Sequence, residues 1–378
     1  MTDFRPLPTE VPDEAPPQGK WGPDILGPGF EAQTLSLHAD SEGPVMATLV
    51  AHRAEADPQA IAGTPKEPGF VALYIHGWND YFFQREQARH VAAAGGAFYA
   101  IDLRKYGRSW RLYQSFGYVD SLDTYDEDLD AALRLIRSEH PHLPLLLMGH
   151  STGGLSAALW ANRHRDQVSA LLLNSPWITW QYDNTSKTVV TPLVRAWSWR
   201  APRQVVPMPE GENIYARSLA GWDSEDGPLP DYLRPWREDP SVRGWNLIPQ
   251  WKTSKSAPIR PGWLQAILAG HTEIAKGLQL TCPTLVWASV GSFGGKWNLL
   301  ARRRDAVLDA DKVAATAHKL STNVTLRRFE SLHDVILSDP DVRQSAWASF
   351  HAWLPMALPQ AANPPSILGE AACTQICP

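Results

Sequence analysis

A serine held between glycines, with a histidine and several aspartates further along the chain, could perform nucleophilic catalysis. The stretch Gly149-His150-Ser151-Thr152-Gly153 follows the G-x-S-x-G pattern, in which a strand turns sharply into a helix and exposes the serine hydroxyl. A hydroxyl attacks a carbonyl carbon only when a base accepts its proton, and that base needs a carboxylate to orient it. Because a glycine-rich turn with an incidental serine fits the pattern equally well, the base and the acid decide the interpretation.

The expected base is His333, which follows directly after a predicted strand over residues 323–330. In folds that carry this motif the serine comes first along the chain, the acid follows a later strand, and the histidine follows the last strand. His333 occupies that last position. Other histidines lie on or beside predicted helices, where a solvated surface position is the simpler interpretation: His140, His142, His164, His318 and His351.

Three aspartates are candidates for the acid, because they follow the predicted strand at residues 281–289: Asp305, Asp309 and Asp311. We prefer Asp305, since the carboxylates of Asp309 and Asp311 can cap the helix expected at residues 310–320. Asp309 remains the alternative acid. A purely structural interpretation of Asp305 is also open, in which it pairs with one of the arginines at 302–304.

Acyl transfer also requires backbone N–H groups that point at the developing oxyanion, and the loss of one donor typically costs about 3 kcal/mol in the barrier. The turn after Ser151 offers the N–H of Thr152. A second donor normally comes from the loop after an early strand. Here His76-Gly77 follows the predicted strand at 70–77, which makes the N–H of Trp78 the expected second donor.

Hydrophobic periodicity predicts the elements that would position these residues. Strands and helices alternate through most of the chain, which implies right-handed βαβ units and a parallel sheet covered on both faces. A hairpin at residues 33–53 would add antiparallel strands at one edge. We therefore predict an α/β fold with a mostly parallel eight-stranded sheet, helices on both faces and an inserted helical cap. Further strands are expected at 96–103, 143–149 and 168–175, and helices at 83–94, 121–140 and 341–354.

The alternation stops after Pro176 and resumes near Thr281. A connection of this length without structure would be unusual inside a domain, so we expect a folded cap there. Most of the clustered tryptophans fall in this segment: Trp177, Trp180, Trp197, Trp199, Trp222, Trp236, Trp245, Trp251 and Trp263. The expected organisation is an extended arm at 1–30, the first part of the core at 31–176, the tryptophan-rich cap at 177–278, the second part of the core at 279–354 and a tail at 355–378.

Composition narrows the function classes. The chain has 378 residues and a formal net charge of -5 at pH 7. A negative net charge gives no positive electrostatic potential that would attract nucleic acid. Three cysteines form neither a disulfide framework nor a zinc spacing, so we expect no metal and no other cofactor. The N-terminus lacks the apolar core of a signal peptide, and no stretch reaches the roughly 18 apolar residues of a membrane span. A cytoplasmic location is therefore the expectation, and the oligomeric state stays open.

Several stretches together resemble the α/β-hydrolase superfamily: His76-Gly77, IDLRKYGRS at 101–109, YDEDLDAAL at 125–133, GHSTGG at 149–154 and LHD at 332–334. The closest branch is that of the monoglyceride lipase and lysophospholipase-like hydrolases, which are also catalogued with serine aminopeptidases. The resemblance spans residues 32 to 354 and is weakest in the cap. It implies the α/β-hydrolase fold and a serine mechanism.

Carried over residue by residue, the resemblance makes Ser151 the nucleophile, His333 the general base, Asp305 the acid, and Trp78 and Thr152 the oxyanion donors. One departure concerns the acid, which in such relatives follows its strand within a few residues. Here GSFGGKWNLLARRR, residues 291–304, intervenes. The choice between Asp305 and Asp309 therefore stays open, and an added loop near the active site is expected.

The predicted function is a serine esterase, lipase or lysophospholipase that cleaves a carboxylic ester. A tryptophan-rich roof favours a small-molecule ester with an apolar or aromatic portion, unless those tryptophans only fill the core of the cap. An amidase, a proline-type aminopeptidase or a C–C bond hydrolase could use the same residues. A catalytically silent ligand-binding or partner-binding protein is the alternative of another class. Dehalogenases and epoxide hydrolases are disfavoured, because they need a carboxylate where this chain has Ser151.

Overall fold

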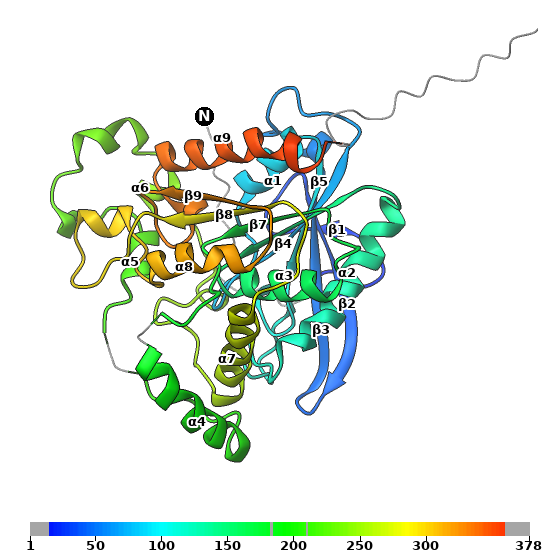
Figure 1. The fold of residues 1–378 in the computed structure, drawn as a ribbon. Helices are drawn as coiled ribbons and strands as arrows, with labels where there is room; N and C mark the ends of the chain where they lie inside the picture. Colours follow the sequence, from blue (N-terminus) through cyan, green and yellow to red (C-terminus); the bar gives the residue numbers. More distant parts are fainter. Residues whose placement is uncertain (1–14, 182–183, 209–210, 360–378) are drawn as a thin grey trace, which may run out of the picture.

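A nine-stranded sheet forms the centre of the molecule in the computed structural model, which describes residues 15–181, 184–208 and 211–359 (Figure 1). The strand order across the sheet is β1-β2-β3-β5-β4-β6-β7-β8-β9. The strands are β1 (Gly22–Pro23), β2 (Phe30–Asp40), β3 (Gly43–His52), β4 (Phe70–Ile75), β5 (Gly96–Asp102), β6 (Leu145–His150), β7 (Ala170–Asn174), β8 (Thr284–Ser289) and β9 (Val324–Phe329).

The pairing confirms the predicted fold class of a mostly parallel sheet. Strands β5, β4, β6, β7, β8 and β9 run parallel, while β1, β2 and β3 are antiparallel to their neighbours. The structure adds one strand to the eight expected, because Gly22 and Pro23 pair with Ala32 and Glu31 inside the segment predicted to be an arm. Two of the three cysteines, Cys373 and Cys377, lie outside the described residues.

Helices cover both faces of the sheet, and successive side chains of β4 show why. Val71, Leu73 and Ile75 belong to one buried core, whereas the alternate residues of this strand belong to the other. On the first face lie α2 (Tyr125–Glu139), α3 (Thr152–Arg163) and α8 (Ala310–Thr316), and on the second lie α1 (Arg85–Ala93) and α9 (Pro340–Ala357) (Figure 1). A strand buried on both faces needs a continuous apolar sequence, as β4 and β6 have.

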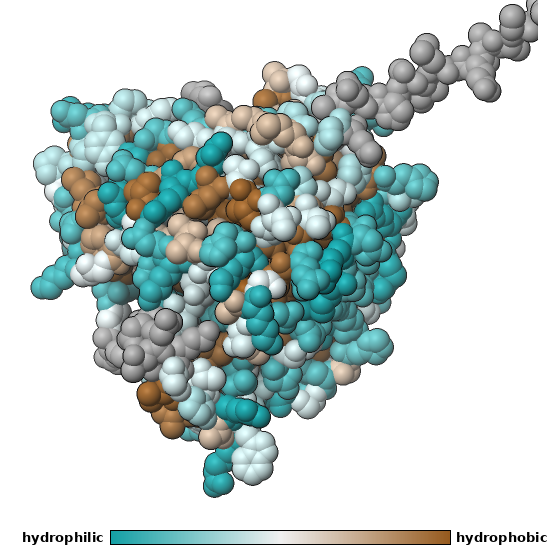
Figure 2. Space-filling view, viewed as in Figure 1, coloured by the Kyte–Doolittle hydropathy of each residue, from teal (hydrophilic) through white to brown (hydrophobic). Residues whose placement is uncertain are grey.

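The long connection between β7 and β8 contains the helices α4 (Asn184–Arg200), α5 (Ile214–Leu219), α6 (Pro240–Arg243) and α7 (Pro261–Lys276). Helix α7 lies against α3 so closely that a Cβ on Gly270 would be 3.0 Å from Leu159. Helix α4 packs on α7 through Val194 and Leu268, with Trp180 from the segment before α4 in the same cluster, and it lies farther from the sheet (Figure 1). Apolar surface appears over α4 in Figure 2, where the side chain of Leu193 is exposed.

Short 3-10 helices join these elements: Ala54–Ala56, Gly107–Ser109, Leu122–Thr124, Ser224–Asp226, Asp231–Trp236, Leu299–Arg303, Ala317–Lys319 and Val335–Leu337. The helix expected at 310–320 is thus α8 followed by a 3-10 turn. Within the described ranges, every helix is too short or too polar to cross a membrane.

Candidate active site

Ser151 lies at the sharp turn from β6 into α3, as the sequence predicts. Its backbone has φ 52° and ψ -116°, a conformation that non-glycine residues rarely adopt and that is typical of strained functional turns. The two flanking glycines make this turn possible. A Cβ on Gly149 would lie 2.6 Å from the carbonyl oxygen of Gly153, and a Cβ on Gly153 would overlap the carbonyl oxygen of His76.

His333 lies in the loop after β9, and its imidazole meets a carboxylate. The Nδ1 of His333 is 2.9 Å from Oδ2 of Asp305, and both side chains are buried. The other oxygen of Asp305 accepts hydrogen bonds from the N–H groups of Val307 (2.7 Å) and Leu308 (2.8 Å). Because backbone donors fix the carboxylate, it can hold the imidazole with Nδ1 protonated and leave Nε2 free to accept a proton.

Asp309 has the structural position that the sequence suggests for it. Its side chain accepts from the N–H of Lys312 (3.0 Å) at the N-terminus of α8. Asp305 is therefore the aspartate that the structure brings to His333. The arginines that precede it have other partners in Asp339, Asp341 and Glu330.

The added loop at 291–304 explains why Asp305 is so far from β8 in the sequence. The loop leaves the strand at Gly291 and returns to the same point, since the N–H of Asp305 donates to the carbonyl of Gly291 (2.9 Å). The N–H of Phe293 donates back to the carbonyl of Asp305 (2.7 Å). The acid thus occupies a position close to the end of β8 in space, although fourteen residues are inserted before it.

The turn after β4 approaches Ser151 closely, as an oxyanion site requires. A Cβ on Gly77 would be 3.1 Å from Cβ of Ser151. His76 holds this turn, because its Nε2 accepts from the N–H of Leu103 (3.1 Å) and its Nδ1 donates to the carbonyl of Gly77 (2.7 Å). Burial lowers the pKa of His76, which favours the neutral ring that this arrangement needs.

The two predicted donors flank the serine. Trp78 and Thr152 line the same cavity as Ser151. Thr152 is the first residue of α3, so its N–H has no partner within the helix. In the part of the chain that the structure describes, the N–H of Trp78 donates to no acceptor either. Their role in binding an oxyanion remains a prediction.

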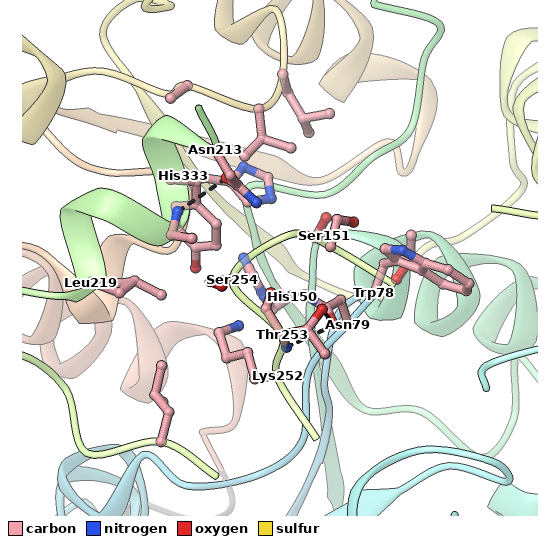
Figure 3. Close-up of a pocket in the computed structure, with 18 of the residues that line it drawn as sticks. Trp78, Asn79, His150, Ser151, Asn213, Leu219, Lys252, Thr253, Ser254 and His333 are labelled. Carbon is pink, nitrogen blue, oxygen red and sulfur yellow. Dashed lines mark hydrogen bonds between the residues drawn. The ribbon is translucent and has the colours of Figure 1, made fainter. Parts of the chain in front are cut away.

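Ser151 and His333 both open into a cavity of about 600 Å³ (Figure 3). Its wall is largely aromatic and aliphatic, and the connection between β7 and β8 contributes Trp177, Trp245 and Trp263. Other tryptophans of this connection have different environments, since Trp251 is buried beside Tyr81 and Trp199 is 87% exposed. The tryptophans of this connection therefore have no single role, and only some of them line the cavity.

Sequence reasoning missed a charged side chain in the cavity. Lys252 lines it, and the Nζ of Lys252 is 2.8 Å from Oδ1 of the buried Asp80. Burial alone would raise the pKa of Asp80, but the attraction of Lys252 and the contact with His150 hold it well below its ordinary value. The surrounding segment has no hydrophobic period, so the sequence offers no signal for this pair.

A serine on a strained turn after a central parallel strand, with an imidazole and a carboxylate from later loops, defines an α/β-hydrolase. The chain has the fold of this superfamily, and its motifs resemble those of the family. Residues 66–224 match the family model described as serine aminopeptidase, S33. The match confirms the resemblance inferred from the motifs.

Curated relatives and solved structures agree with this assignment. Monoacylglycerol lipase of Mycolicibacterium smegmatis is 24% identical over 277 residues, which is 73% of this chain and 84% of that protein. A thermostable carboxyl esterase from Bacillus coagulans has a TM-score of 0.57 at 18% identity, covering 86% of this chain and 99% of its own. Monoglyceride lipase from Saccharomyces cerevisiae has a TM-score of 0.56 at 13% identity, covering 86% and 96%. These structures share the fold, and the chain is similar to lipases and esterases.

Proposed function

We propose that this protein hydrolyses carboxylic esters through an acyl-enzyme on Ser151. The observation that carries the proposal is that Ser151 and His333 open into one cavity while Asp305 lies 2.9 Å behind the imidazole. The similarity to a monoacylglycerol lipase and to a carboxyl esterase supports the same chemistry.

In the first half of the reaction, His333 accepts the proton of the Ser151 hydroxyl as its oxygen attacks the ester carbonyl. The negative charge that develops on the carbonyl oxygen is stabilised by the N–H groups of Trp78 and Thr152. When the intermediate collapses, the imidazolium returns the proton to the departing alcohol. Asp305 keeps the imidazole oriented and stabilises its positive charge throughout.

In the second half, water replaces the alcohol. His333 accepts a proton from the water molecule as it attacks the acyl-enzyme, and the same N–H groups stabilise the second oxyanion. The serine oxygen then takes back the proton and the carboxylic acid leaves. Trp177 and Trp263 form the apolar wall that favours an aliphatic or aromatic part of the ester, and the connection between β7 and β8 acts as the cap.

The cavity supports an ester substrate over an aminopeptidase substrate. An aminopeptidase must bind the positively charged amino terminus of a peptide, which requires a carboxylate in the pocket. Among the described residues that line the cavity there is no aspartate or glutamate, so the cavity offers no carboxylate to pair with that group. The competing class of a silent binding protein requires a nonfunctional Ser151, and labelling tests this directly.

The test is labelling with a fluorophosphonate probe, followed by peptide mapping and ester hydrolysis. We expect the probe on Ser151, hydrolysis of p-nitrophenyl esters well above that of aminoacyl anilides, and loss of both labelling and turnover in Ser151→Ala. Ser345→Ala, on the exposed side of α9, is the matched control and should keep both. Undiminished ester hydrolysis by Ser151→Ala would contradict the proposal.

A further inference from the structure

A buried ion pair that the reaction above does not use forms part of the cavity next to Ser151. The side chains of Lys252 and Asp80 are 7% and 1% exposed, and their charged atoms are 2.8 Å apart. Lys252 lines the cavity, whereas Asp80 lies behind it, with its second oxygen 3.6 Å from Nδ1 of His150. The ammonium is therefore the member of the pair that faces a bound substrate.

The position of Lys252 is fixed by the core of the molecule. Its neighbour Thr253 exchanges hydrogen bonds with the side chain of Asn79, at 2.8 Å through the Thr253 carbonyl and at 3.1 Å through its N–H. Earlier in the same segment, the N–H of Ile248 donates to the hydroxyl of Tyr81 (2.9 Å). A polar group that is held in place before the substrate arrives binds the substrate without a further loss of its own conformational entropy.

Tyr215 is a second polar residue next to Lys252. Tyr215 lines the cavity, its ring is 5.5 Å from Nζ of Lys252, and it also packs edge-on against His333. Within the described residues the Tyr215 hydroxyl is buried without a hydrogen-bond partner. Burial keeps the pKa of Tyr215 well above its ordinary value, so this hydroxyl stays a neutral donor. Figure 3 shows Lys252 on one side of Ser151 and Trp78 on the other.

The charges around the pair indicate which ligand fits. Asp80 neutralises Lys252, and Asp334 adds a second buried carboxylate 3.9 Å from His150. Asp305 is a third, behind His333. A carboxylate or phosphate of a substrate would face this negative surplus, whereas a neutral oxygen accepts a hydrogen bond from the ammonium without repulsion.

We propose that Lys252 and Tyr215 form a specificity site that binds a neutral oxygen, such as a hydroxyl or ether oxygen, of the ester substrate. The site deepens the proposed ester hydrolysis and rests on it. An ester that lacks the oxygen leaves the buried Tyr215 hydroxyl without a partner and the ammonium with Asp80 alone. Such mismatches discriminate more strongly than the loss of a methylene does. The polar atom can belong to the alcohol or to the acyl part, and matched substrate pairs distinguish the two.

The test compares esters that differ only by oxygen in place of carbon. For the alcohol part the pair is 2-hydroxyethyl butyrate and propyl butyrate. For the acyl part the pair is p-nitrophenyl 4-methoxybutyrate and p-nitrophenyl hexanoate. Each is measured with wild type, with Tyr215→Phe, and with the double variant Lys252→Met/Asp80→Asn, which removes both buried charges together and so avoids leaving one unpaired.

We expect wild type to prefer the oxygen-bearing ester in one of the two pairs by about tenfold in kcat/KM. The double variant should abolish that preference, and Tyr215→Phe should reduce it about threefold. A merely structural role would lower kcat/KM equally for both members of the pair and would overturn the inference. So would an unchanged preference, or a stronger preference for an ester that carries a carboxylate at the same place.

A direct measurement of ligand binding separates this test from the test of ester hydrolysis. In the Ser151→Ala background, calorimetry with both members of each pair measures the preference without turnover. If fluorophosphonate labelling fails but the oxygen-bearing ester still binds more tightly, the hydrolase proposal fails and the specificity site stands. If labelling succeeds and neither ester of a pair binds more tightly, the hydrolase proposal stands and the specificity site fails.

Discussion

The carboxylate of Asp305 lies 2.9 Å from Nδ1 of His333, although 28 residues and the whole of β9 separate the two along the chain. The contact depends on two loops that both follow the carboxyl ends of parallel strands. One follows β8 and closes on itself at Gly291, and the other follows β9. In α/β folds with a parallel sheet, ligands usually bind at the carboxyl ends of the strands.

Asp305→Asn should reduce kcat by about 10³-fold to 10⁴-fold, because the neutral amide no longer holds the imidazole in the required tautomer. Asp309→Asn is the matched control, since asparagine caps a helix as well as aspartate does. We expect it to keep kcat/KM within about threefold. Steady-state kinetics on a soluble ester measures both, and a larger loss in Asp309→Asn than in Asp305→Asn would reverse the assignment of the acid.

Gly153→Ala should disrupt the turn that presents Ser151. A Cβ at this position would overlap the carbonyl oxygens of His76 and Ile75, which belong to the rigid end of β4. We expect a loss of about 2 kcal/mol or more in the free energy of unfolding, together with a fall in kcat. Gly294→Ala is the control, because no atom lies within 4 Å of a Cβ placed there. Equal denaturant midpoints for the two variants would contradict the close packing described for the turn.

Trp263→Ala should weaken catalysis with long-chain esters more than with acetate esters. The ring of Trp263 lines the cavity and lies 3.9 Å, centroid to centroid, from that of Trp78. Its removal takes away apolar surface worth about 2 kcal/mol for a bound chain. Trp199→Ala should leave the acyl-chain profile unchanged, as its side chain faces solvent. A flat chain-length profile in Trp263→Ala and wild type alike would argue that the wall does not contact the acyl group.

Acid should destabilise the protein partly through Asp57. Burial alone would raise the pKa of this carboxyl, but His52 (2.9 Å) and Arg89 (2.7 Å) outweigh it and hold the pKa well below the ordinary value of 3.8. A depressed pKa contributes stability that is fully present above the ordinary value and is lost as pH falls below it.

Asp57→Asn should therefore cost about 3 kcal/mol near pH 7, and the difference from wild type should shrink as pH falls below about 4. Asp311→Asn, which affects a side chain 77% exposed, should shift the unfolding free energy little at any pH. Denaturant titrations at several pH values measure both. A difference between wild type and Asp57→Asn that stays constant with pH would refute the role of the ion pair.

The sequence predicts those site residues that directly follow a strand. Once β6 and β9 are placed from the sequence, Ser151 and His333 follow from their positions directly after those strands. Asp305 could be preferred but not settled, because the return of its loop to Gly291 is a tertiary contact. Lys252 lies beyond such reasoning, since the hydrogen bonds that fix its segment join Asn79 and Thr253 across 174 residues.

The Lys252 side of the cavity is built from two stretches that are distant along the chain. Hydrogen bonds join them between Asn79 and Thr253 and between Tyr81 and Ile248. A chimera that takes the connection between β7 and β8 from a relative would lose these hydrogen bonds. If residues 79–81 are not exchanged as well, the new cavity wall has no matching partners to hold it in position. Engineering of selectivity in this protein should therefore move both stretches as a unit.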